Sequence, residues 1–127
     1  MILKGVRLEP EYPSSNILLD NMVARCYLNS KVNPSYPLDQ IKGFMKDGSW
    51  FLTVPAEDGA MELGFDQDDV YDCIVNYLSE THFYKTMESE KRPGLMQDVY
   101  HITYRNHRLY VKLQINVGAV VISFKSQ

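Results

Sequence analysis

The last third of the chain alternates apolar and polar residues with the period of two that is typical of β-strands. Three such runs are DVYHITY, LYVKLQI and AVVISFK, at residues 98–104, 109–115 and 119–125. They are separated by RNHR and NVG, which are short, turn-forming connections. The pattern therefore predicts three consecutive strands that pair as an antiparallel meander.

The alternation also predicts which side chains share a face of this sheet. In the middle run, the apolar residues at 109, 111, 113 and 115 point to one side. In the last run, Val120, Ile122 and Phe124 are expected to share an apolar face. If the apolar faces pack into one core, an exposed polar face remains, and it is lined by Tyr110, Lys112, Gln114, Ser123 and Lys125.

Helical spacing of apolar residues replaces the alternation in the middle of the chain. One helix is predicted at Leu38–Lys46, with Gly48 just past its end. The clearest helix is predicted over residues 66–80, and its apolar stripe consists of Val70, Cys73, Ile74, Tyr77 and Leu78. Three aspartates in its first turn, at 66, 68 and 69, are interpreted as a cap and a solvated face because negative charge suits a helix N-terminus.

The segment between the two helices is predicted to contain a short strand, SWFLTVP, that is closed by Pro55. AEDGAMELGF, at residues 56–65, is interpreted as a loop with at most a short helical turn. Helices that precede a short antiparallel sheet indicate an α+β fold rather than a βαβ winding.

The first 37 residues are interpreted as a separate N-terminal extension, and residues 38–127 as the main domain. Two proline-containing stretches flank LLDNMVARCYLN in the extension, where apolar residues fall at helical spacing. The chain contains no apolar run of the roughly 20 residues that span a bilayer, and its start lacks the apolar region of a signal peptide. We expect a cytoplasmic protein whose Cys26 and Cys73 are reduced core residues.

Charge is distributed unevenly along the 127 residues, whose net charge is −3. Residues 38–80 carry ten acidic and two basic side chains, whereas residues 81–127 carry three acidic and seven basic ones. The basic part is also rich in tyrosine, so it is compatible with a site for a polyanion. Charge alone favours the alternative, a solvated face with uneven charge and no ligand.

The residue types in this basic part favour chemistry without a metal or cofactor. The chain has no glycine-rich phosphate loop, nucleophile elbow or His-Glu metal motif, and its three histidines are scattered. Lysine, arginine, tyrosine and glutamine suit the cleavage of RNA by its own 2′-hydroxyl, because the substrate supplies both the nucleophile and the scissile phosphate. Exposed tyrosines would give unpaired bases a surface on which to stack.

Several motifs resemble the MqsR family of bacterial toxins (motility quorum-sensing regulator type). They are LGFD at 63–66, LSETHFYKTM at 78–87, MQDVY at 96–100, LYVKLQI at 109–115 and VVISFK at 120–125. The resemblance implies the compact α+β fold of RelE-type toxins and a metal-independent endoribonuclease that cleaves mRNA. It also implies a cognate antitoxin, of helix-turn-helix type and encoded nearby, as the protein partner of a type II toxin–antitoxin system.

The resemblance also implies the site residues. The family lysine of the FYK triplet falls on Lys85, the glutamine of QDVY on Gln97, the strand tyrosine on Tyr110 and the lysine of SFK on Lys125. These four are the candidate catalytic residues. The candidate RNA-binding residues are Tyr84, Arg92, Arg108 and Lys112.

The chain differs from the family pattern in two places. Met96 stands where the family commonly has tryptophan, and residues 1–37 have no counterpart in the short family members. An alternative hypothesis is therefore a catalytically weak relative that acts as a protein-binding or transcription-control module. A further alternative is that the extension covers the active face of its own domain.

Overall fold

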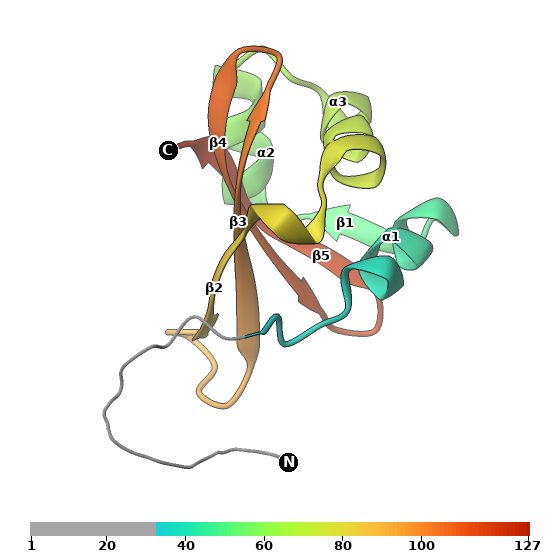
Figure 1. Ribbon diagram of the computed structural model, residues 1–127, viewed down its shortest axis with the longest axis vertical. Coiled ribbons are helices and arrows are strands. Elements are labelled where there is room, and N and C mark those ends of the chain that lie inside the picture. Colours follow the sequence, from blue (N-terminus) through green and yellow to red (C-terminus); the bar gives the residue numbers. More distant parts are fainter. Residues whose placement is uncertain (1–32) are drawn as a thin grey trace. The chain divides into compact units, whose positions relative to one another are not determined.

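A computed structural model describes residues 33–127, so the expectations for the N-terminal extension, Cys26 included, lie outside the described part. One strand lies among the helices in the first half of this part, and the other four strands of the sheet follow the helices (Figure 1). The elements are α1 (Leu38–Lys46), β1 (Trp50–Leu52), α2 (Val54–Glu62), α3 (Gln67–Asp72), the π-helical turn η1 (Cys73–Tyr77), the 3₁₀ turn η2 (Glu80–His82), β2 (Phe83–Glu88), β3 (Met96–Tyr104), β4 (His107–Ile115) and β5 (Ala119–Ser126). None of the helices in this part is long and apolar enough to cross a membrane.

The five strands form one sheet in the order β1-β5-β4-β3-β2. The predicted meander is confirmed, because β3, β4 and β5 are antiparallel neighbours. At its two edges the sheet gains β2, which pairs antiparallel with β3, and β1, which runs parallel to β5. The α+β class is confirmed by this mostly antiparallel sheet and the helices beside it.

The hydrophobic core packs one face of the sheet against α1, α3 and η1, and it also includes Ala56 and Ala60 of α2. The helices α1 and α3 lie on the same side of the sheet in Figure 1. The predicted α1 is confirmed to the residue, and its buried side chains are Leu38, Ile41 and Met45. The sheet supplies the fully buried Val111, Leu113 and Phe124. Burial of such side chains contributes about 1.5–3 kcal/mol each, so this face fixes the fold.

The prediction of a loop at residues 56–65 was wrong, because α2 occupies most of it. The side chain of Thr53 caps this helix by accepting a hydrogen bond from the Ala56 backbone N–H at 3.2 Å, and Pro55 stands in the first turn, where a missing N–H does no harm. The helix packs against β5 through Gly59, where a Cβ atom would lie 2.4 Å from the Phe124 carbonyl oxygen. Thr53 and Pro55 thus mark the start of this helix locally, and Gly59 allows it to pack closely against β5.

The helix predicted over residues 66–80 is divided into α3 and the π-helical turn η1. Asp66 and Asp69 form a capping box at its start, with N–H···O distances of 2.9 and 3.1 Å, as the capping interpretation requires. Val70, Cys73, Ile74 and Leu78 are buried, but Tyr77 is exposed. Widening of the helix at η1 turns Tyr77 away from the stripe that a regular helix would give it.

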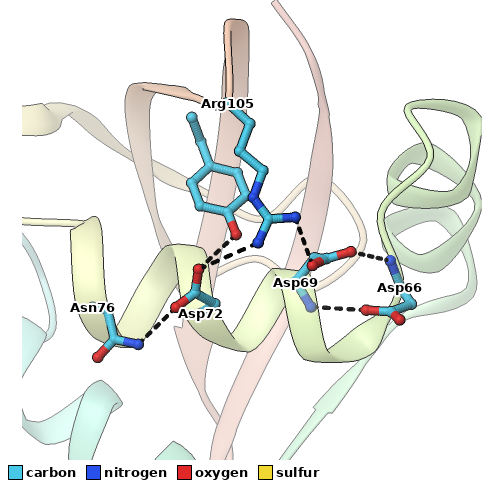
Figure 2. A network of polar contacts seen from close by, with 6 residues as sticks. Asp66, Asp69, Asp72, Asn76 and Arg105 are labelled. Atoms are coloured by element: carbon cyan, nitrogen blue, oxygen red, sulfur yellow. Dashed lines mark hydrogen bonds and ion pairs between the residues drawn. The ribbon is translucent and has the colours of Figure 1, made fainter.

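A polar network joins this helix to the turn between β3 and β4 (Figure 2). The Arg105 guanidinium donates to Asp69 at 2.8 Å, and the Tyr104 hydroxyl donates to Asp72 at 2.7 Å. Asp72 also accepts from the Asn76 amide at 2.7 Å. These contacts lower the pKa of the Asp72 carboxyl, with the Asn76 and Tyr104 hydrogen bonds as the main causes. The acidic first part of the helix thus holds the hairpin in place.

The predicted faces of β5 were partly wrong. Phe124 points into the core, and Ser123 and Lys125 lie opposite Lys112 and Tyr110 on the polar face, as expected. A bulge shifts the register beyond Ser123, so Val120 lies opposite Gln114 on the other face of the sheet, where it is buried but outside the core cluster. A bulge inserts one residue into one strand and reverses the side of every residue beyond it, and nothing in the local alternation reports it.

Candidate functional site

The face of the sheet opposite the core gathers aromatic and basic side chains from four adjacent strands. β4 contributes Tyr110, which is paired with His101 of β3 on one side and with Lys125 of β5 on the other. β2 contributes Tyr84 and Lys85, because its register shifts between Phe83 and Lys85. We call Tyr84, Lys85, His101, Arg108, Tyr110, Lys112 and Lys125 the polar face cluster.

Three rings of this cluster form a row across the strands. Tyr84 stacks on His101 with the ring centroids 4.1 Å apart and the planes 17° from parallel. His101 lies 5.9 Å from Tyr110 at an angle of 44°. The row is partly open to solvent through Tyr84, which is 43% exposed.

Lysine ammonium groups surround this row of rings. Lys85 Nζ lies 5.7 Å from the centroid of the Tyr84 ring. Lys125 Nζ and Lys112 Nζ lie 5.2 and 5.9 Å from the centroid of the Tyr110 ring. These distances are within the range of cation–π contact, so the rings help to hold positive charges close together.

The titratable groups respond to this arrangement. Burial, followed by the neighbouring Lys125 and Lys85, lowers the pKa of Lys112, although Glu90 offsets part of the effect. Burial and the positive charges of Lys85 and Arg108 lower the pKa of His101 below its usual 6.5, so its imidazole is neutral at pH 7. Burial, and then Tyr84, raises the pKa of Tyr110, which keeps its phenol protonated. The face thus combines positive charge with a neutral proton acceptor and a proton donor.

Gln97 lies on β3 and is 7% exposed. Its amide nitrogen donates to the side-chain oxygen of Gln114, 3.1 Å away on β4. Both of these candidate residues lie on strands, because Lys85 belongs to β2, a strand that was not predicted from the sequence, and Gln97 belongs to β3. The strand β2 was not predicted, because its six residues do not alternate regularly between apolar and polar side chains.

The structure brings most of the predicted site residues together. Lys85, Tyr110 and Lys125 lie on the polar face with Tyr84, Arg108 and Lys112. Gln97 shares this side of the sheet, since its pair with Met87 lies two residues along the strands from the pair of Lys85 and Val99. Arg92 lies apart from the cluster, in the loop between β2 and β3.

His101 was not among the predicted site residues, because the sequence shows only that the three histidines are scattered. The other two have structural contacts: His82 Nδ1 accepts from the Ser79 backbone N–H at 3.0 Å, and the His107 ring packs edge-on against Phe65 at 5.2 Å. The alternation along β3 distinguishes His101 from the other two histidines. It lies between the buried Tyr100 and Ile102, so its side chain points to the opposite face of the sheet.

A groove of about 460 Å³ adjoins the cluster at Lys112. Its floor includes Gln97 and Gln114, and the loop between β2 and β3 forms one of its walls with Leu95 and Arg92. Its opposite wall includes the apolar side chains of Phe51, Val120 and Ile122, of which the last two reach it through the bulge in β5. The groove therefore combines apolar side chains with a pair of amides and with charged side chains of both signs, since Glu90 lines it together with Lys91, Arg92 and Lys112.

Two further features bear on the chemistry of residues 33–127. Within this part of the chain, no group of three His, Cys, Asp or Glu side chains converges in a way that could hold a metal ion. Cys73 is buried as predicted, and burial raises the pKa of its thiol to about 12. Its thiol is thus a core group and no nucleophile.

The chain is similar in sequence to proteins of known family. The family model described as "Motility quorum-sensing regulator, toxin of MqsA" matches residues 33–126. A curated relative is the mRNA interferase toxin MqsR of Escherichia coli (strain K12). It is 32% identical over 97 residues, which cover 76% of this chain and 98% of the relative.

Proposed function

Since the chain belongs to the family of motility quorum-sensing regulator toxins, we propose that it is an endoribonuclease toxin that cleaves mRNA and is neutralised by a cognate antitoxin. The name of the Escherichia coli relative, an mRNA interferase toxin, supports the substrate. The observation that carries the proposal is the polar face cluster itself, which surrounds a row of rings with basic side chains. Such a surface suits a single strand of RNA, whose bases stack on rings and whose phosphates pair with cations.

Cleavage would proceed by attack of the ribose 2′-oxygen on the adjacent phosphorus. The O2′–P bond forms, the P–O5′ bond breaks, and the products are a 2′,3′-cyclic phosphate and a 5′-hydroxyl. The protein must orient these atoms in line, accept the 2′-hydroxyl proton, stabilise the phosphorane and protonate the leaving oxygen. The reaction needs no metal if side chains supply the charge.

The polar face offers one group for each of these tasks. Neutral His101 accepts the proton of the 2′-hydroxyl, because its lowered pKa leaves it unprotonated at neutral pH. Lys85 and Lys125 stabilise the negative charge of the phosphorane. Tyr110, protonated and next to Lys125, donates the proton to the leaving oxygen. Gln97 orients the substrate from the floor of the adjacent groove.

The remaining basic and aromatic residues bind the strand on either side of the reacting phosphate. Tyr84, stacked on His101, offers its exposed ring to an unpaired base. Arg108 and Lys112 pair with neighbouring phosphates, and Arg92 extends the basic surface onto the loop between β2 and β3. In this proposal the protein acts in the cytoplasm, where it meets mRNA and a helix-turn-helix antitoxin.

The test is cleavage of single-stranded RNA by the purified protein in the presence of EDTA. The proposal expects 2′,3′-cyclic phosphate ends and a loss of at least about 100-fold in rate for Lys85→Ala, the order expected when one group that stabilises transition-state charge is removed. Lys46→Ala is the matched control, because Lys46 is an exposed lysine of α1. Undiminished cleavage by Lys85→Ala would refute the assignment of the site, and cleavage that EDTA abolishes would refute the metal-independent mechanism.

A further inference from the structure

The groove beside the polar face cluster has a construction that the cleavage chemistry does not explain. Its floor contains two glutamines that are 7% and 6% exposed, Gln97 and Gln114. Buried amides are costly unless their hydrogen-bonding groups are satisfied. Their mutual bond uses one N–H of Gln97 and one lone pair of Gln114, so the Gln114 N–H groups and the Gln97 oxygen can still serve a ligand at this floor.

The walls of the groove are suited to a flat ring. Phe51 is 54% exposed although it lies on a strand, and it lines the groove together with Val120 and Ile122. Val120 is directly opposite Gln114 in the register of β4 and β5, and Phe51 is directly opposite Val120 in that of β1 and β5. A floor that donates and accepts hydrogen bonds thus continues into an apolar wall with an aromatic side chain.

The opposite wall is held in place by hydrogen bonds within the loop between β2 and β3. The Ser89 backbone N–H donates to the Leu95 carbonyl at 2.8 Å, and the Arg92 backbone N–H donates to the Ser89 hydroxyl at 3.2 Å. The Gly94 backbone N–H donates to the Glu88 carboxylate. Because these bonds fix the loop, Leu95 and Arg92 form a defined wall before any ligand arrives.

We propose that this groove binds one unpaired nucleobase of the RNA, next to the phosphate that the polar face cluster cleaves. Phe51 packs against the face of the base, and the Gln97–Gln114 pair forms hydrogen bonds with its edge. A nucleobase has the required chemistry, since its two faces are apolar and its edge carries donors and acceptors in one plane. The groove volume lies within the range of about 300–1,000 Å³ that is usual for small-ligand pockets.

The position of the groove connects it to the reaction. Lys112 lines the groove and also lies 5.9 Å from the centre of the Tyr110 ring, so one side chain borders both places. A nucleotide with its base in the groove would bring its phosphate to this lysine. The inference rests on the proposed function, and it adds that Gln114 determines which base is preferred beside the scissile bond, whereas Phe51 strengthens the binding of that base.

The experiment maps cleavage sites over a random-sequence RNA pool and measures binding of a non-cleavable 2′-O-methyl RNA. Gln114→Leu keeps the size of the side chain and removes its edge groups, so it is expected to relax the base preference at one position beside the scissile bond. Phe51→Ala is expected to weaken binding by roughly 5- to 150-fold, the range that stacking of one base gives. The control is Met61→Ala, because Met61 is an apolar residue of α2 that is also mostly exposed, and it should change neither the base preference nor the RNA binding.

The possible results separate this inference from the proposed function. Cleavage by both variants with an unaltered base preference and unaltered RNA binding would overturn the base site and leave the ribonuclease proposal intact. If the wild-type protein does not cleave, the binding measurement still decides, because RNA binding that Phe51→Ala weakens supports the groove and absent binding overturns it. Variants that weaken only the complex with the antitoxin would overturn the inference in favour of a protein-docking groove. Because Phe51 is exposed, its truncation tests the groove even if Gln114→Leu does not fold.

Discussion

The salt dependence of RNA binding offers a quantitative test of the polar face cluster. Four of its side chains are cations that can pair with phosphates: Lys85, Arg108, Lys112 and Lys125. Each phosphate that a protein neutralises on a single strand contributes about −0.7 to the slope of log K against log salt concentration. Four pairs therefore predict a slope of about −2.8, which is a loss of about 50-fold in affinity between about 50 mM and about 200 mM salt.

Lys125→Ala is the most informative perturbation of this slope. Lys125 is exposed near the end of β5, so its truncation leaves the core unchanged. With three cations left, the slope should become shallower, at about −2.1, and the loss of affinity over the same range of salt should decrease to about 20-fold. Lys46→Ala removes the same charge from α1 and should leave the slope at its wild-type value.

The measurement is fluorescence anisotropy of a labelled single-stranded 2′-O-methyl RNA, titrated with each protein at several salt concentrations. The 2′-O-methyl groups prevent cleavage, so the affinity is an equilibrium quantity that does not depend on the catalytic mechanism. An unchanged slope for Lys125→Ala would refute the assignment of Lys125 to phosphate binding. An equal decrease for Lys46→Ala would refute the reasoning as a whole, because it would mean that binding responds to net charge and not to this face.

Three further predictions concern the packing and titration of single residues. Gly59→Ala should lower the free energy of unfolding by about 1–3 kcal/mol in chemical denaturation, because the new Cβ would meet the Phe124 oxygen. Gly43→Ala is the control: there is open space around this position, so the substitution should raise the free energy of unfolding by about 0.5–1 kcal/mol. Equal effects of the two substitutions would contradict the close packing of α2. His101→Gln should lower the cleavage rate by about 100-fold or more. In the wild type the rate should fall as the pH drops below about 6.5, through the lowered pKa of His101, and the variant should lack this fall. If the variant keeps the fall in rate at low pH, the proton acceptor is a different group. Burial raises the pKa of Asp98, so the folded protein holds a proton on this carboxyl more tightly than the unfolded chain does. The unfolding free energy of the wild type, relative to that of Asp98→Asn, should therefore decline as the pH rises from about 4 through the folded pKa and then level off. A difference between the two proteins that does not change with pH would contradict this.

The sequence by itself determined the elements whose signal is local. Leu38–Lys46 and the meander of β3, β4 and β5 were predicted because the period of apolar residues reports directly which side of an element is buried. The same period placed Tyr110 and Lys125 on a common polar face before any contact was known. Capping by Asp66 could likewise be predicted, since a cap involves residues only three positions apart.

Tertiary structure alone decided the features that depend on partners distant in the sequence. The packing of α2 on β5 depends on Gly59, which allows the two backbones to meet, and β2 pairs as a strand with the edge of β3. The bulge in β5 transfers Val120 from the core to the groove, and no local pattern distinguishes a strand with one inserted residue from a regular one. The rows of a sheet are assembled across strands, so the contact of His101 with Tyr84 and Tyr110, and that of Gln97 with Gln114, follow from strand register and not from spacing along the chain.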